Sequence, residues 1–110
     1  MNTTKIIESI SIQRFKEILS KYKSKIKVGS HALDHLSDLQ RKLFKEEDLI
    51  RILIRENSRG VGLQRNGRYA AFFRRKEGFL RIIFEVKLAF VVILAALESK
   101  PDLFNNDSTL

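Results

Sequence analysis

The sequence predicts an α+β fold: an antiparallel four-stranded meander plus a short N-terminal strand, with the helices packed on one face of the sheet. Apolar residues recur at helical spacing before Gly60 and alternate with polar residues after it. Turn sequences, above all Asn66-Gly67, divide the second half of the chain into strands. A chain of 110 residues with 44% hydrophobic residues has material for one core, so we expect a single domain.

The first half of the chain predicts three helices and one strand. A helix is expected over residues 11–22, because its apolar residues share one side and its lysines the other. Ser30 can cap a second helix, whose apolar stripe would run from Ala32 to Leu43. Acidic residues from Glu46 onwards suit the start of a third helix. Between the first two helices, the alternating residues 25–28 indicate a short strand with one buried face.

Four strands are expected after the third helix, over residues 61–65, 68–75, 79–86 and 90–97. Asn66-Gly67 predicts a two-residue type I′ turn between the first two strands, because that turn needs positive φ at both central positions. Lys76-Glu77-Gly78 predicts the second turn, and residues 87–89 predict a third tight connection. Consecutive strands joined in this way form a meander.

These turns and the alternation along the strands assign side chains to the two faces of the sheet. The face under the helices is expected to hold Val61, Leu63, Ala70, Phe72, Leu80, Ile82 and Phe84. The opposite face is expected to hold Gln64, Tyr69, Ala71, Phe73, Arg75, Phe79, Arg81 and Ile83. Arginines between aromatic rings can bind phosphates and stack bases. In the alternative interpretation, the N-terminal helix or a second subunit covers the rings and the arginines are solvated.

The net charge of +8 and the sequence pI of about 10.1 indicate a negatively charged partner. The excess of positive charge lies in two segments. One contains Arg59, Arg65, Arg68, Arg74, Arg75, Lys76 and Arg81, and the other contains Arg14, Lys16, Lys21, Lys23, Lys25 and Lys27. Such clustering is typical of phosphate-backbone binding, although an acidic protein or an anionic membrane surface would also fit it.

Several classes of site and location are not expected. The chain has no cysteine, which excludes disulfides, thiolate catalysis and cysteine-based metal sites. We expect cytoplasmic localisation, because charged residues interrupt the N-terminal segment where a secretion signal would be apolar. The apolar run 88–97 is too short to cross a bilayer, so no membrane partner is expected. No cofactor or metal is expected either: His31, His35 and Asp38 could share one side of the second helix, but the pattern lacks the glutamate of a zinc-protease helix.

One motif in the last third of the chain combines a glycine, an aromatic residue, an arginine, apolar residues and a glutamate, over residues 78–86 (GFLRIIFEV). A hydrophobic strand over residues 90–95 and the segment Lys100-Pro101-Asp102-Leu103-Phe104 follow it. In this motif and in the order of its elements, the chain resembles the RelE/ParE toxin superfamily over residues 25–104. Residues 1–24 would then form an N-terminal helical extension and residues 105–110 a flexible tail.

The resemblance implies an RNA-binding fold, and ribosome-dependent RNases of this superfamily cleave mRNA with basic residues and a C-terminal tyrosine. By position, Arg81 matches the central arginine and Lys100 the later basic residue. Phe104 stands in place of the tyrosine, and phenylalanine can stack on a base but cannot transfer a proton. The stretch Ser30-His31-Ala32 also resembles a sister group of small RNase-like domains with a histidine at the start of the first helix. His31 is therefore the candidate general base or acid.

Two functions remain open from the sequence. The first is a toxin-like, metal-independent endoribonuclease acting on mRNA, with His31, Arg81 and Lys100 in catalysis. The residues expected to hold its RNA are Arg65, Arg68, Tyr69, Phe73, Arg75 and Phe104. The second is a non-catalytic basic module, such as a ParE-like inhibitor or a binder of nucleic acid or acidic protein, which the missing tyrosine favours. The expected partners are RNA, including ribosome-bound mRNA, an acidic antitoxin protein, and a second copy of the chain in a homodimer.

Overall fold

The structure, a computed structural model, describes residues 3–99, which form three helices and a six-stranded sheet in an α+β arrangement. The helices are α1 (Ile12–Lys21), α2 (Asp38–Leu43) and α3 (Glu46–Arg55). The strands are β1 (Ile6–Ile10), β2 (Ile26–Val28), β3 (Gly60–Gln64), β4 (Tyr69–Arg75), β5 (Gly78–Val86) and β6 (Val91–Ser99).

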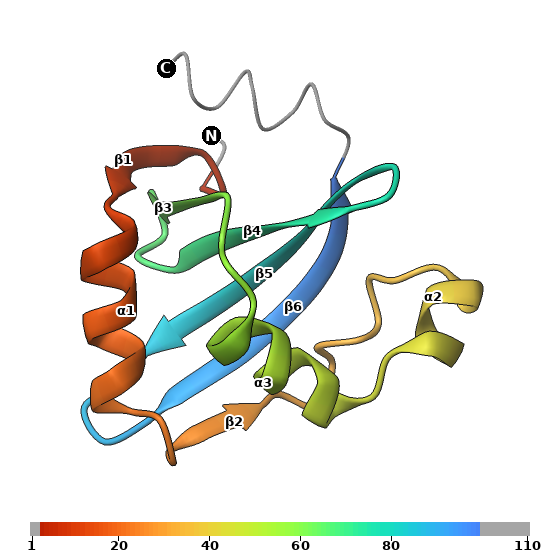
Figure 1. Cartoon of the computed structure of the whole chain (residues 1–110), viewed down its shortest axis with the longest axis horizontal. Helices are drawn as coiled ribbons and strands as arrows, with labels where there is room; N and C mark the ends of the chain where they lie inside the picture. Colours follow the sequence, from red (N-terminus) through yellow and green to blue (C-terminus); the bar gives the residue numbers. More distant parts are fainter. Residues whose placement is uncertain (1–2, 100–110) are drawn as a thin grey trace.

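The strands lie in the order β1-β3-β4-β5-β6-β2 (Figure 1). β3 to β6 form the expected antiparallel meander. β1 pairs with β3 in the antiparallel direction, and β2 pairs with β6 in the parallel direction. The sheet is therefore mostly antiparallel, with a strand from the first thirty residues at each edge.

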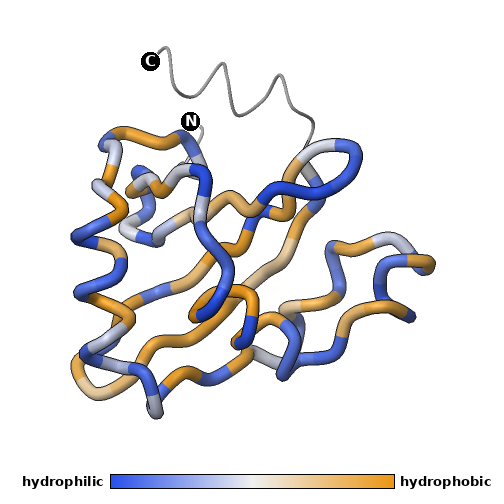
Figure 2. The backbone as a smooth tube through the Cα atoms, in the orientation of Figure 1, coloured by the Kyte–Doolittle hydropathy of each residue, from blue (hydrophilic) through white to orange (hydrophobic). Residues whose placement is uncertain are grey.

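Helices α1 and α3 cover one face of the sheet, which we call the helix face (Figure 1). Ser11 caps α1 by accepting a hydrogen bond from the backbone N–H of Arg14, and the apolar side of the helix then faces the sheet. The main core joins the buried residues of both helices to β3, β4, β5, β6 and the segment after β2. Its largest fully buried aromatic side chains are Phe73 and Phe84. Figure 2 shows the result as hydrophobic strands behind helices whose outer sides are hydrophilic.

The opposite face, which we call the far face, carries a smaller apolar cluster. Ala70, Phe72 and Ile83 are its buried members, and Ile6 and Phe79 pack against them.

The strand β1 was not predicted, and Gly62 explains how it fits at the edge of the sheet. A Cβ atom at Gly62 would lie 2.6 Å from a methyl carbon of Ile6, so the glycine gives this side chain room on β3.

The β3–β4 loop differs from the prediction by one residue. Leu63 pairs with Tyr69, and the backbone N–H of Gln64 donates to the carbonyl of Arg68. The loop therefore has three residues instead of two, and only its glycine, Gly67, has positive φ (85°) among the described loop residues. This is the geometry of a three-residue hairpin loop that ends in a left-handed glycine.

The β4–β5 turn differs by one residue in the other direction. Arg75 pairs with Gly78, so the turn has two residues, Lys76 and Glu77, where three were expected. The two differences cancel for β3 and β5, so Val61, Leu80, Ile82 and Phe84 lie in the main core as predicted. They do not cancel for β4, whose side chains exchange faces. The predicted faces of Tyr69, Ala70, Ala71, Phe72, Phe73 and Arg75 are therefore wrong.

The helix predicted to begin at Ser30 is also wrong at its start. Residues 30–36 form turns, and α2 begins only at Asp38. The backbone N–H of Ala96 donates to the carbonyl of Ala32, so this segment continues along β6 beyond β2. Ala32 and Leu36 reach the core from these turns, whereas Leu39 and Leu43 are exposed on α2.

None of the helices in the described part of the chain has the length and apolar composition needed to span a bilayer.

Asp48 stabilises the start of α3 as an ionised group. Its carboxylate accepts a hydrogen bond from the backbone N–H of Lys45 at 2.8 Å and pairs with Arg51 at 2.8 Å. These contacts, the backbone hydrogen bond first, lower the pKa of Asp48 below its usual 3.8. Because the pKa is lowered in the folded state, the stabilisation is present above the unfolded value and is lost as the pH falls through the folded value.

We predict that Asp48→Asn lowers the melting temperature at neutral pH, and that the difference from wild type shrinks below about pH 4. Thermal unfolding followed by circular dichroism across this pH range measures it. Glu47→Gln is the control, because it removes a charge from the same helix turn and leaves the Lys45–Asp48 hydrogen bond in place. Equal pH dependence of the two variants would contradict the assignment.

Candidate nucleic-acid interface

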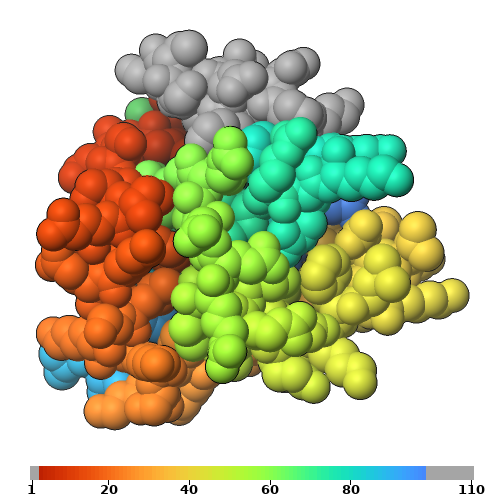
Figure 3. All heavy atoms as spheres, viewed as in Figure 1, coloured from red at the N-terminus to blue at the C-terminus, as the bar shows by residue number. Residues whose placement is uncertain are grey.

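A cleft of about 350 Å³ lies between α2, the end of β6 and the β4–β5 hairpin. In Figure 3 the two segments that form its rim, around residues 40 and 76, lie side by side on the right of the molecule. The cleft is lined by Gln40, Phe44, Arg75, Lys76, Glu77, Phe79, Leu80 and Glu98. It thus combines aromatic, cationic, amide and carboxylate groups.

Ser37 fixes one wall of the cleft. Its hydroxyl accepts a hydrogen bond from the backbone N–H of Gln40 and so caps α2. The same hydroxyl donates to the carboxylate of Glu98 at 3.3 Å, which ties the helix to β6. Phe44, directly after α2, is half-buried and packs against the main core. These contacts hold a six-residue helix that buries none of its own side chains.

Arg75 fixes the opposite wall. Its guanidinium donates to both carboxylate oxygens of Glu56, at 2.8 and 3.3 Å, and to the carbonyl of Arg74 at 2.7 Å. Glu56 follows α3 directly, so this pair links the β4–β5 hairpin to the helix layer. The three hydrogen bonds use three of the five guanidinium N–H groups. Two N–H groups are left for other acceptors, on a side chain whose position is already set.

The far face carries two arginines over aromatic rings. The guanidinium carbon of Arg74 lies 5.5 Å from the ring centroid of Phe79, and that of Arg81 lies 5.5 Å from the ring centroid of Phe72. Phe72 and Phe79 meet edge to face at 6.5 Å. Cations and aromatics therefore alternate on this face, with Phe72 and Arg74 in the places expected for Phe73 and Arg75. The ring of Phe72 is buried, however, so it cannot stack on a base in this structure.

Among the described residues, the others predicted to bind RNA lie apart from the cleft or inside the core. Arg65 and Arg68 lie at the β3–β4 loop, where Arg68 approaches Glu85 at 3.9 Å. Tyr69 is half-buried and stacks on Phe84 with ring centroids 5.3 Å apart. Phe73 is fully buried in the main core, so its ring cannot stack on a base in this structure. The cause is the exchanged face of β4.

His31 lies in an exposed turn after β2 instead of at a helix start. Its Nδ1 is 2.7 Å from the carboxylate of Asp34, whose other oxygen lies 3.7 Å from the guanidinium of Arg41. The idea that His31, His35 and Asp38 share one side of a helix is wrong, since α2 begins at Asp38. Within residues 3–99, no three histidine or acidic side chains are grouped so that they could hold a metal ion.

The structure does not bring His31 and Arg81 into one site. Arg81 extends from β5 over β4 and donates to the carbonyl of Thr4 at 3.3 Å. His31 lies beyond the other side of β6. Two strand spacings of about 4.8 Å separate the backbone positions of β5 and of the segment after β2, and the guanidinium of Arg81 extends in the opposite direction, over β4. Lys100 and Phe104, the other two residues that the resemblance singles out near the C-terminus, lie outside the described residues.

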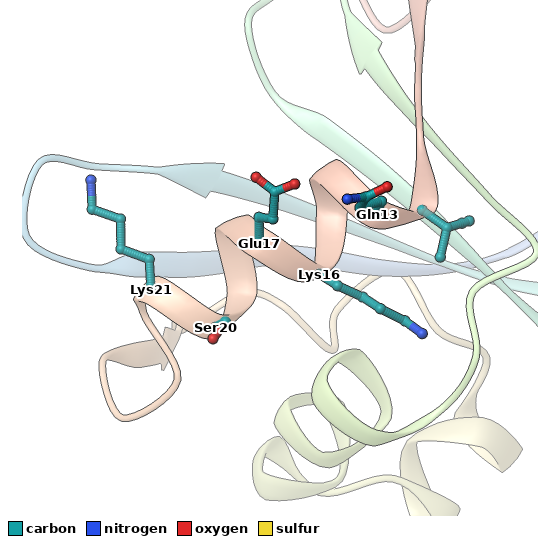
Figure 4. Close-up of a pocket in the computed structure, with 6 residues that line it drawn as sticks. Gln13, Lys16, Glu17, Ser20 and Lys21 are labelled. Carbon is teal, nitrogen blue, oxygen red and sulfur yellow. The ribbon is translucent and has the colours of Figure 1, made fainter.

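Two further depressions involve α1. One is lined only by residues of this helix, and Figure 4 shows its side chains extending in different directions, with Lys16 and Lys21 pointing away from each other. The other is a groove of about 250 Å³ between α1 and α3, with Leu19 and Leu53 among its lining residues. Neither combines cations with an aromatic ring and a hydrogen-bonding amide as the cleft does.

Sequence reasoning missed Gln40, Phe44 and Glu98 as site residues. Phe44 did carry a signal, because it precedes the helix cap Lys45 and is five residues before Leu49, the spacing of a hydrophobic staple. Gln40 and Glu98 carry no local signal, since only the packing of α2 against β6 brings them together.

In comparisons with known proteins, no family model, no curated protein and no solved structure matches this chain.

We predict that Arg75 and Glu56 are energetically coupled. A double-mutant cycle of Glu56→Ala and Arg75→Ala should give a coupling of about 0.5–1 kcal/mol, because the pair is bidentate but partly exposed. Urea unfolding of the four proteins measures it. A coupling indistinguishable from zero would mean that Arg75 is not held against Glu56 in solution.

Proposed function

We propose that this chain is a toxin-like RNA-binding protein that holds one nucleotide of single-stranded RNA in the cleft between α2 and the β4–β5 hairpin. The observation that carries the proposal is the meeting of Phe44 and Phe79 with Arg75 and Lys76 around one cleft. Proteins bind single strands by stacking bases on aromatic rings and by placing cations along the phosphates. The volume of the cleft is at the lower end of the range for small-ligand sites, which suits a single base.

The charges of the cleft suggest how the nucleotide is oriented. Arg75 and Lys76 are balanced by Glu77 and Glu98, so the cleft itself has little net charge. Such a lining suits a neutral base, whose edges Gln40 and Glu98 can read by hydrogen bonding. The phosphates on either side of that base would then contact the exposed cations of the hairpin, Arg74 and Lys76.

We predict that Phe44→Leu weakens the binding of single-stranded RNA by on the order of tenfold, because it keeps an apolar side chain but removes the stacking ring. Lys76→Ala should reduce the slope of log affinity against log salt by about one, the loss of a single phosphate contact. Fluorescence anisotropy of a labelled oligonucleotide at several salt concentrations measures both effects.

The matched controls are Leu43→Ala and Lys42→Ala, which alter neighbouring exposed residues of α2 that do not line the cleft. Both should bind RNA nearly as wild type does. If all four variants lose affinity equally, the cleft has no special role. If affinity is independent of salt, phosphate contacts do not contribute.

A second candidate function, metal-independent RNA cleavage, is favoured by the His31–Asp34 pair. A carboxylate at the Nδ1 of an exposed histidine orients the ring and leaves Nε2 available for proton transfer. In such a reaction the 2′-oxygen attacks the adjacent phosphorus after a base takes its proton, and the bond to the 5′-oxygen breaks as an acid supplies a proton. Arg41 could stabilise the charge on the phosphate. The catalytic role assigned to Arg81 stays a prediction.

If the chain cleaves RNA, His31→Ala should lower the cleavage rate by on the order of 10²-fold with RNA affinity largely retained. Asp34→Asn should reduce the rate less, since it acts through the ring of His31. His35→Ala, a neighbouring exposed histidine, is the control. Gel analysis of free RNA and of ribosome-bound message measures the rate. If wild type cuts neither substrate, the enzyme hypothesis is dropped and RNA binding is judged by the cleft variants alone.

A further inference from the structure

The turn between β5 and β6 presents an apolar tip. Residues 87–90 connect the two strands, and the backbone N–H of Lys87 donates to the carbonyl of Phe90 at 2.8 Å. Leu88, at the end of this turn, is 98% exposed, the highest value among the exposed large hydrophobic side chains of the described residues. Ala89 is also exposed and Phe90 is half-exposed. The tip therefore points away from the core.

Two basic segments surround the tip. The hydroxyl of Tyr22, after α1, donates to the carbonyl of Leu88 at 3.4 Å, and the backbone N–H of Val91 donates to the carbonyl of Lys25 at 2.9 Å. The ammonium of Lys27 lies 4.6 Å from the ring centroid of Phe90. In Figure 1 the end of α1, the start of β2 and the β5–β6 turn meet at one corner, and in Figure 2 the tip there is hydrophobic beside hydrophilic backbone.

We call this corner the basic end. Its exposed lysines are Lys21, Lys23, Lys25, Lys27 and Lys87. Glu17, one helical turn before Lys21, approaches Arg14, and Glu85 is already paired with Lys87 and Arg68. Those two cations, Lys87 first, hold the pKa of Glu85 below its usual value. The basic end therefore has a clear positive excess around an apolar tip.

We propose that the basic end docks reversibly on an anionic membrane surface, with Leu88 inserted among the lipid headgroups. A convex aliphatic tip inside a ring of lysines matches that surface, because the apolar residue enters the headgroup region while the cations meet lipid phosphates and carboxylates. RNA fits less well, since an aliphatic side chain cannot stack on a base. A folded protein would need a pocket shaped for a protruding leucine, whereas a lipid surface deforms around it. The proposal does not depend on RNA binding in the cleft. It departs from the sequence-based expectation of no membrane partner, which rested on the lack of a segment long enough to cross a bilayer.

The experiment uses the native lack of tryptophan in the chain. Leu88→Trp and, as its control, Leu43→Trp each place one fluorophore at an exposed leucine. Vesicles of phosphatidylcholine alone are compared with vesicles in which about a third of the lipid is phosphatidylserine. We expect the emission of Leu88→Trp to shift to shorter wavelength with the anionic vesicles only, and that of Leu43→Trp to stay unchanged. No shift for Leu88→Trp, or equal shifts for both variants, overturns the proposal.

Vesicle sedimentation then separates insertion from charge. Leu88→Ser should lower the affinity for anionic vesicles by about tenfold, and each of Lys23→Ala and Lys25→Ala by about fivefold. Lys42→Ala and Leu43→Ser, on α2, should bind as wild type does. If Leu88→Ser binds normally, or if the lysine variants lose RNA affinity while vesicle binding is unchanged, the basic end is not a lipid-docking surface. The affinity of all these variants for RNA is measured in parallel, so this outcome is distinct from failure of the cleft.

Discussion

The pairing of β4 between β3 and β5 is the constraint on which the rest of the structure depends. It decides which ring enters the core, Phe73, and which joins the arginines of the far face, Phe72. It also turns Arg75 toward the helix layer, where Glu56 can hold it beside the cleft. Because side chains alternate along a strand, a shift of one residue would reverse all these assignments together. A three-residue loop before β4 and a two-residue turn after it set the register.

The sequence was sufficient to predict the elements whose apolar residues recur with a clear period, but it was not sufficient to predict the register of β4. Helices α1 and α3 and the four strands of the meander appear where apolar spacing predicts them. Asn66-Gly67 marks the first turn correctly, yet a glycine with positive φ fits both a two-residue loop and a three-residue loop, and only the packing of Phe73 under the helices selects the second. β1 was not predicted because its five residues are stabilised by pairing with β3, where Gly62 leaves space for the side chain of Ile6.

The candidate site was predictable in part for a similar reason. Charge clustering identified the cation-rich β4–β5 hairpin, because charge is visible in composition. It could not identify the opposite wall, since Gln40 and Glu98 are far apart in the chain and meet only through Ser37. His31 was a candidate from its residue type and position, whereas its contact with Asp34 arises from turns in a segment whose spacing suggested a helix. Local hydrogen bonds of this kind compete with helix formation, and no periodic pattern of residues in the sequence indicates them.

The two edge strands have a consequence for how the protein is made. β1 and β2 leave the ribosome first, but their partners are β3 and β6, and β6 ends at Ser99. β1 therefore stays unpaired until β3 has been synthesised, and β2 until β6 has been synthesised, and contacts so distant in sequence form slowly. A product truncated before β6 would lose the partner of β2 and leave β5 as an open edge, a template for aggregation. Formation of the native sheet therefore requires synthesis through β6, and translation products that end before this strand would not assemble the sheet.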